Sequence, residues 1–388
     1  MINPFSIEEE EYTNLLNHHV TRGKLVTAQI GDIHLGALNP KVQYDIIKAQ
    51  IVDELMKLPK LDIISIPGDF FDHKVQNGSD VSMYASLLMA EFVNVCKAKD
   101  ATLIIIEGTD SHDARQIRSF SNYILDPTVD FRIVENIQFE YTKGAKILCI
   151  PELYGIDENI YSQYLQYSGL YDMCFMHGTI HGAIYGDTVG NGRLFHIEDF
   201  CNCRGPIYAG HVHKPGCFDK HFYYTGTPIR YKHGEEEPKG FLITIQDLDT
   251  GYYDCYFKEV FSFKYTTLHM SELLSNDPRE IIEYINNKKT SEGIDNIRII
   301  FDLPIPEMTK IVINNFYRNS KDVSIKYSDI EAERIKREKA DVKEAEEYAF
   351  ILNDKYTDEE KFVMFCNYKK GEQFITVKEL EDILSGDF

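Results

Sequence analysis

The feature that most constrains the fold is a series of short apolar segments separated by stretches of helical periodicity. Apolar runs at 24–30, 61–66 and 102–106 have the length of buried strands. Between them, residues 41–58 carry Ile, Leu and Met at helical spacing, and 80–98 also predict a helix. This alternation predicts right-handed βαβ units around a largely parallel sheet. We therefore expect an α/β fold.

The segments that follow predict a second sheet. Apolar runs on either side of Lys143-Gly144 indicate a β-hairpin, and further apolar runs extend to about residue 257. We expect residues 24–261 to form a two-sheet sandwich with helices on its outer faces. Residues 262–328 have a β-α-β-α-β pattern typical of a small α/β capping domain. Residues 329–388 predict charged helices, which either form a solvated surface or dock a partner.

Polar residues follow the apolar strands at the point where each strand ends. The candidates of this kind are Asp32, His34, Asp69, His112, Asp113, His177, His211 and His213. In parallel sheets, ligands bind outside the carboxyl ends of the strands. A single Asp or His at such a position is usually turn chemistry or a packed side chain. The recurrence at successive strand ends is much harder to explain in that way.

Carboxylates and imidazoles together are a ligand set that suits Mn²⁺, Fe²⁺ or Zn²⁺. The candidates are too many for one ion, and Asp69 is placed centrally enough to bridge two. Two ions about 3.5–4 Å apart form the clamp of phosphatases and nucleases. The sequence therefore predicts a dinuclear phosphoesterase centre.

The charge balance constrains the partners. The formal net charge is −21, whereas a protein that binds nucleic acid alone usually has a basic surface. Either the substrate is not a nucleic acid, or a partner protein or local patch holds it. The eight scattered Cys fit free thiols in the cytoplasm. No apolar run is long enough to cross a membrane, and the polar, acidic extension at 1–23 does not resemble a secretory signal.

In their order along the chain, these motifs resemble those of the calcineurin-like metallophosphoesterases. They are Asp32-x-His34, Gly68-Asp69-x-x-Asp72, a box at 108–113, His177-Gly178 and Gly210-His211-x-His213. The segment Tyr224-Thr225-Gly226-Thr227-Pro228-Ile229-Arg230, with Gly234-Glu235 and Lys239-Gly240-Phe241, is similar to the SbcD-type nuclease subunits of double-strand-break repair. The resemblance covers about 24–260, and more loosely the stretch to 328.

The resemblance implies a role for each residue. Asp32, His34, Asp69 and His213 would hold the first ion, and Asp69, His177 and His211 the second. His112 would protonate the leaving 3′-oxygen or position the phosphate, and Asp113 would orient His112. Two Mn²⁺ ions are implied, with Mg²⁺ or other divalent metals as substitutes.

One motif departs from the family pattern. The family box is Gly-Asn-His, and its Asn binds the second ion. Here Thr109-Asp110-Ser111 separates Gly108 from His112, and no Asn is present. Counted back from His112, Ser111 takes the Asn position, with Asp110 or water as the alternative ligand.

The resemblance implies a cytoplasmic, Mn²⁺-dependent DNA exonuclease with single-strand endonuclease activity. It would act in DNA repair or recombination as a homodimer with an SbcC-like coiled-coil ATPase. The residues leave two alternatives open. One is a dinuclear phosphatase or cyclic-nucleotide phosphodiesterase, and the other is a scaffold subunit that the altered 108–113 box has weakened catalytically.

Overall fold

The chain forms an α/β structure, as the sequence predicts, with two six-stranded sheets in its larger compact unit. The computed structural model describes residues 21–327, apart from 167–168, 183–192, 220, 274 and 303–305, and a few isolated positions between 357 and 378. The larger unit comprises Met1–Thr266 and Gly293–Asn296, and the smaller comprises Thr267–Glu292 and Ile297–Phe388. Most of the expected extension at 1–23, and the expected helices at 329–388 apart from those isolated positions, lie outside the described residues.

The first sheet has a parallel centre in the order β14-β13-β1-β2-β3-β4. Its strands are β1 (Leu25–Gln29), β2 (Ile63–Pro67), β3 (Thr102–Ile106), β4 (Asp130–Val134), β13 (Gly240–Gln246) and β14 (Tyr253–Glu259). Strands β1 to β4 are parallel, whereas β13 and β14 add antiparallel at the β1 side. Every residue of β1, β2 and β3 is buried, which explains why these strands are continuous apolar runs in the sequence.

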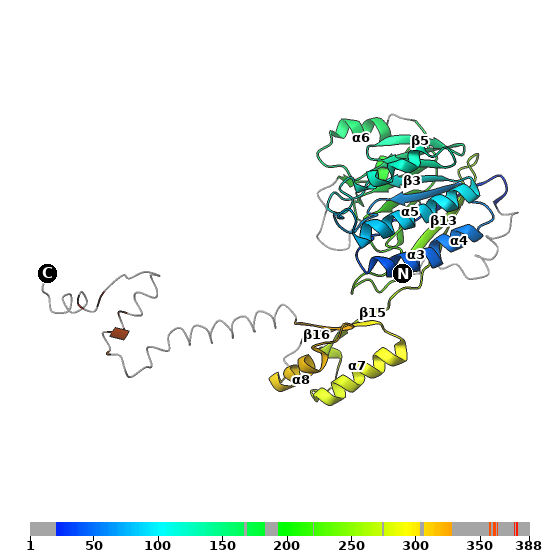
Figure 1. Cartoon of the computed structure of the whole chain (residues 1–388). Coiled ribbons are helices and arrows are strands. Elements are labelled where there is room, and N and C mark those ends of the chain that lie inside the picture. The colour runs from blue at the N-terminus through cyan, green and yellow to red at the C-terminus, as the bar shows by residue number, and fades with distance from the viewer. Residues whose placement is uncertain are drawn as a thin grey trace. The chain divides into compact units, whose positions relative to one another are not determined.

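Helices cover the outer face of the first sheet (Figure 1). They are α3 (Pro40–Ile47), a π-helical turn η1 (Lys48–Val52), α4 (Asp53–Lys57), α5 (Asp80–Lys99) and a 3-10 helix η2 (Gln116–Leu125). The helix expected at 41–58 is therefore α3, η1 and α4 in succession. Helix α5 begins after Ser79, whose hydroxyl accepts from the Ser82 amide, and ends at Asp100 in the left-handed conformation.

The second sheet also has a parallel centre, in the order β11-β12-β10-β7-β6-β5. Its strands are β5 (Gln138–Thr142), β6 (Ala145–Ile150), β7 (Met173–His177), β10 (Ile207–Gly210), β11 (Gly216–Asp219) and β12 (Phe222–Tyr224). Strands β6, β7, β10 and β12 are parallel, and β5 joins β6 through the expected hairpin. Beside this sheet lie α6 (Glu158–Leu165), the 3-10 helix η3 (Ile197–Phe200) and a ribbon of β8 (Thr179–Ile180) and β9 (Leu194–Phe195).

The two sheets share a hydrophobic core between their inner faces. Ile63 and Ile104 of the first sheet belong to one buried cluster with Ile147, Phe175 and Tyr208 of the second. Polar contacts join the sheets at their strand ends, where the carbonyl of Pro67, at the end of β2, lies 2.8 Å from Nδ1 of His177 at the end of β7. The carboxyl ends of both sets of parallel strands therefore meet at one border.

The smaller unit has its own three-stranded sheet, in the order β15-β16-β17. Its elements are β15 (Tyr265–His269), the 3-10 turn η4 (Met270–Glu272), α7 (Pro278–Glu292), β16 (Asn296–Phe301), α8 (Glu307–Tyr317) and β17 (Val323–Tyr327). This is the β-α-β-α-β order that the sequence predicts for 262–328. None of the helices that the structure describes has both the length and the hydropathy that crossing a membrane requires.

Candidate metal centre

The chain turns sharply at the strand ends that carry the candidate ligands. Asp32, His34, Asp69 and His211 have positive φ angles of 49°, 44°, 49° and 87°. A left-handed backbone costs most L-residues about 1–2 kcal/mol, and such strain concentrates at functional sites. Half of the eight non-glycine residues with positive φ in the described chain are therefore candidate ligands.

Two glycines let the strand ends approach each other closely. A Cβ atom on Gly68 would lie 2.2 Å from Nδ1 of His177, and Gly68 itself has a φ of 88°. A Cβ on Gly210 would lie 2.2 Å from the Pro67 carbonyl oxygen and 2.7 Å from the same His177 atom. Larger residues at either position would push His177 out of place.

Asp69 lies at the centre of the cluster and is 3% exposed. Its Oδ2 is 3.7 Å from Nε2 of His34 and 3.3 Å from Nε2 of His177. Its Oδ1 accepts a hydrogen bond of 2.6 Å from the Thr109 amide. Asp69 therefore presents one oxygen between a histidine of each sheet, as the sequence-based bridging role requires.

Asp32, His34 and His213 form one side of the cluster with Asp69. Nε2 of His34 and Nε2 of His213 face each other at 3.0 Å. Oδ1 of the fully buried Asp32 accepts from the His211 amide at 2.8 Å, while its buried Oδ2 has no hydrogen-bond partner. An unsatisfied buried carboxylate oxygen is costly, which indicates a missing cation or donor.

His177 and His211 lie on the other side, together with Glu152, which none of the sequence motifs predicts. Oε2 of Glu152 is 3.4 Å from Nε2 of His177 and 3.2 Å from Nδ1 of His211. Glu152 follows β6 directly after Pro151, so it also stands at the carboxyl end of a parallel strand. That position is the one sequence signal that could have identified it.

The 108–113 box places its residues differently from the sequence-based expectation. Ser111 and Asp110 are exposed, and Asp110 belongs to no group of described His, Cys, Asp and Glu residues with metal-ligand geometry. Thr109 faces the cluster instead, because its hydroxyl donates to Oε2 of Glu152 at 3.1 Å and lies 3.3 Å from Nε2 of His177. The structure does not bring Ser111 or Asp110 to the second ion position.

His112 and Asp113 point to different neighbours. Nδ1 of His112 hydrogen-bonds to the carbonyl oxygen of Asp72, and the His112 ring meets the His34 ring edge-on with centroids 4.6 Å apart. The buried Asp113 carboxylate accepts from the amides of Phe71 at 3.1 Å and Gly108 at 2.8 Å. Asp113 thus fixes the loops around the site, and the carbonyl of Asp72 is the observed partner of His112.

His213 is supported from behind by Glu235 and Lys239. Oε1 of Glu235 lies 3.1 Å from Nδ1 of His213, which leaves Nε2 facing the cluster. Nζ of the fully buried Lys239 donates to the His213 carbonyl oxygen at 2.7 Å. A carboxylate behind a histidine is the usual support of a metal-binding imidazole.

The pKa shifts of His34, Asp69 and His177 favour a bound cation. Burial lowers the pKa of His34 to about 3, so this imidazole is neutral at neutral pH. Burial opposes ionisation of Asp69, but His177 and His34 outweigh it and hold the pKa of Asp69 well below its usual range. Burial likewise opposes the charge on His177, yet nearby carboxylates raise the pKa of His177 well above its usual range. A cation would replace that proton.

The donor set fits divalent metal ions. Asp32, Asp69 and Glu152 are buried carboxylates, and in the described part of the chain their ion pairs are with histidines rather than with Lys or Arg. Three groups of described residues each present ligand atoms within 4.8 Å of one another: Asp32-Asp69-His177, Glu152-His177-His211 and His34-Asp72-His112. Buried charge of this kind needs compensation, and a cation would supply it.

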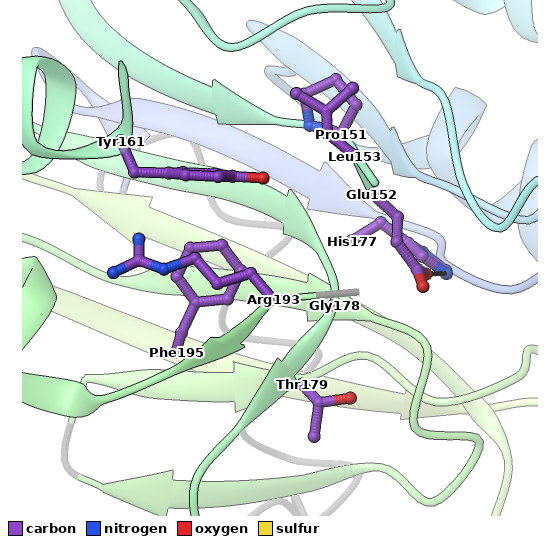
Figure 2. A pocket seen from close by; sticks show the side chains of 9 residues that line it. All are labelled: Pro151, Glu152, Leu153, Tyr161, His177, Gly178, Thr179, Arg193 and Phe195. Carbon is purple, nitrogen blue, oxygen red and sulfur yellow. Dashed lines mark ion pairs between the residues drawn. The ribbon is translucent and has the colours of Figure 1, made fainter. Parts of the chain in front are cut away.

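A small pocket adjoins the second group (Figure 2). Glu152 and His177 line one side of it, and Tyr161, Arg193 and Phe195 line another. The Arg193 guanidinium lies 4.6 Å from the centroid of the Tyr161 ring and 4.8 Å from that of Phe195. It also pairs with Glu158 and Asp199, at 3.2 and 3.4 Å, so its charge is already balanced.

Comparisons with known proteins identify no family. No family model and no curated protein matches the chain. A solved protein of unknown function from Aquifex aeolicus is 20% identical, with a TM-score of 0.23 over 45% of this chain and 88% of that one. Another solved structure is 11% identical, with a TM-score of 0.36 over 61% of this chain and 100% of the other. Similarities this low carry no functional argument.

Proposed function

We propose that the protein is a dinuclear metal-dependent phosphodiesterase with the two-sheet fold of the calcineurin-like metallophosphoesterases, and that it acts as an SbcD-type DNA nuclease. The observation that carries the proposal is the position of Asp69 Oδ2, 3.7 Å from Nε2 of His34 and 3.3 Å from Nε2 of His177. One carboxylate oxygen between two imidazoles from two sheets is the arrangement that a bridged pair of ions requires.

Each ion position would have its own ligands. Asp32, His34 and His213 would hold the first ion, His177 and His211 the second, and Asp69 both. Mixed imidazole and carboxylate donors support Mn²⁺, with Mg²⁺ or another divalent metal as a substitute. When bound, such ions activate a water molecule and stabilise the charge that develops on the phosphate.

His112 would act on the leaving group. Its Nδ1 is held by the Asp72 carbonyl oxygen, so Nε2 is the ring atom left to carry a proton to the leaving 3′-oxygen or to bind the phosphate. The half-buried ring lies beside His34, on the first-ion side. Asp113 would keep the 108–113 loop in shape through its two backbone hydrogen bonds.

The nuclease part of the proposal rests on the resemblance of residues 224–241. Within this segment, Glu235 and Lys239 contact His213. The net charge of −21 supports a partner that supplies much of the DNA affinity. We propose an SbcC-like coiled-coil ATPase for that role, with 329–388 as a docking segment, and a cytoplasmic homodimer working in DNA repair or recombination.

The same net charge favours one alternative, a phosphatase or cyclic-nucleotide phosphodiesterase, because a small substrate needs no basic surface. One assay separates the alternatives. The purified chain is incubated with Mn²⁺ and labelled linear duplex or single-stranded DNA, beside p-nitrophenyl phosphate and cyclic nucleotides, with Asp69→Asn as the control. DNA degradation that the variant loses supports the nuclease. Hydrolysis of small esters alone supports the alternative, and no turnover with metal bound supports a scaffold subunit.

A further inference from the structure

Glu152 is a buried carboxylate at the metal centre that the sequence motifs leave without a role. Its side chain is 4% exposed, and its backbone amide donates to the carbonyl oxygen of Glu107, just beyond β3, at 3.3 Å. The residue therefore sits where the ends of the two sheets join. Figure 2 shows its carboxylate turned toward His177.

The two oxygens of Glu152 have different surroundings. Oε1 accepts a hydrogen bond of 2.7 Å from the Tyr154 hydroxyl, which holds the side chain in one orientation. Oε2 faces the cluster, where it accepts from the Thr109 hydroxyl and lies near His177 and His211. One oxygen is thus anchored, and the other is available to a cation.

The His177 tautomer shows that Glu152 faces a ligand atom. Nδ1 of His177 donates to the Pro67 carbonyl oxygen, so the lone pair of the neutral ring is on Nε2. That Nε2 is 3.3 Å from Asp69 Oδ2 and 3.4 Å from Glu152 Oε2. Ligand atoms about 2.0–2.2 Å from one ion lie at roughly such separations from each other. A carboxylate that only oriented His177 would contact Nδ1 instead. Glu152 does contact Nδ1 of His211, at 3.2 Å, so the ligand assignment rests on its contact with Nε2 of His177.

Thr109 explains why a carboxylate is needed from elsewhere. It follows Gly108 directly, so it occupies the place of the family's Asn when the box is counted forward from the glycine. Its single hydroxyl hydrogen can be donated to Glu152, at 3.1 Å, or to Asp69, at 3.3 Å, and the side chain has no carbonyl oxygen to offer a cation. Asp110 and Ser111 form the extra length of the loop and are exposed.

We propose that Glu152 is an anionic ligand of the second ion and replaces the neutral Asn of the family pattern. The proposal rests on the two-ion function above. It gives the second ion two carboxylates, Asp69 and Glu152, and two imidazoles, His177 and His211. Because one more negative charge faces this ion, its binding depends strongly on the charge of residue 152.

The test is a calorimetric titration with Mn²⁺ of the full chain, the Glu152→Gln variant and the Glu235→Gln variant. Wild type is expected to bind two ions, and Glu152→Gln is expected to weaken the second by more than about 100-fold, beyond the range for orienting residues. Glu235→Gln is the matched control, because Glu235 contacts Nδ1 of His213 behind the cluster. It should retain both ions with a loss of about 10–100-fold at one of them.

A loss of less than about 100-fold in Glu152→Gln would overturn the ligand assignment. So would fewer than two ions in wild type. Thermal unfolding in EDTA checks that the variant folds, and Glu152→Ala, which removes both carboxylate oxygens, replaces it if it does not. Glu152→Ala should show the same loss, and full affinity in this variant would contradict the proposal. If the titrations agree but wild type degrades no DNA, the ligand assignment stands and the nuclease proposal fails.

Discussion

The two sides of the candidate metal centre use similar residues but are built differently. On the first side, Asp32, His34 and His213 all come from motifs with two polar residues in close spacing. On the second side, Asp110 and Ser111 of the 108–113 loop are exposed, and Glu152 from the neighbouring strand end contacts His177 and His211. Several strand ends meet at the same border of the two sheets, so more than one of them can place a side chain at a given ligand position.

The supports of the histidines differ as well. His213 is held by the Glu235 side chain at 3.1 Å, whereas His177 is held by the Pro67 backbone carbonyl at 2.8 Å. A side-chain support can be removed by substitution, but a backbone support depends on the course of the chain. Mutations should therefore affect the first side through chemistry and the second side through backbone geometry.

The largest effect is expected for Asp69→Asn, because Asp69 belongs to both sides. We expect loss of both tight Mn²⁺ sites and a fall in phosphodiester hydrolysis of more than about 10⁴-fold, since each ion contributes several kcal/mol to charge stabilisation. Labelled-DNA degradation and calorimetry measure the two effects. Asp126→Asn, which alters a surface pair with Lys97, is the control and should behave like wild type. Two ions retained at full affinity in Asp69→Asn would disprove the bridge.

His112→Ala is expected to separate catalysis from metal binding. Turnover should fall by about 10²–10⁴-fold, the usual contribution of a general acid, while both ions still bind. The comparison requires kcat and Mn²⁺ stoichiometry on the same preparation. His73→Ala is a matched control, because His73 is exposed and contacts Asp72 rather than the cluster. If His112→Ala lost both ions, His112 would be a structural or ligand residue instead.

Glu235→Gln tests the side-chain support of the first side. We expect Mn²⁺ affinity at the first ion to fall by about 10–100-fold and the second ion to be affected less. Glu236→Gln removes a charge from the adjacent, exposed residue and should leave both affinities unchanged. A titration of each variant measures this difference. Equal losses in the two variants would show that net charge, and not the contact with His213, is responsible.

Gly68→Ala tests the backbone support of the second side. Its Cβ would lie 2.2 Å from Nδ1 of His177, in addition to the strain of a φ of 88°. Gly78 has a similar φ of 79°, but a Cβ there would meet no atom within 4 Å. Urea unfolding in EDTA should show a loss of about 1 kcal/mol for Gly78→Ala and more than about 2 kcal/mol for Gly68→Ala. Equal losses would mean that strain alone matters at Gly68.

Much of the fold could be predicted because the central parallel strands are continuous apolar runs. The sequence does not predict strand β4, because Asp130 and Arg132 interrupt its apolar pattern and its burial is uneven. The region expected to form one long α-helix contains a π-helical turn at Lys48–Val52, which the helical periodicity did not distinguish. Strand β11 has only four residues, too few for a periodic pattern, and pairs with β12.

The site was predictable where two ligands occur close together in the sequence. Glu152 was not, because a single Glu after a strand has no partner at a diagnostic spacing, and only the packing of β6 beside β7 brings it to His177. The extra residues of the 108–113 box can be aligned in two ways, by counting forward from Gly108 or back from His112. In the structure, the Thr109 amide donates to Asp69, whereas Asp110 and Ser111 are exposed.

The most direct test of the bridged centre is a crystal structure of the chain soaked in Mn²⁺, with the ions located by anomalous scattering. We expect two peaks about 3.5–4 Å apart, one on each side of Asp69, with Asp69 Oδ2 in both coordination spheres. A single peak, or two peaks that do not share Asp69, would contradict the bridged centre on which the proposed phosphodiesterase activity depends.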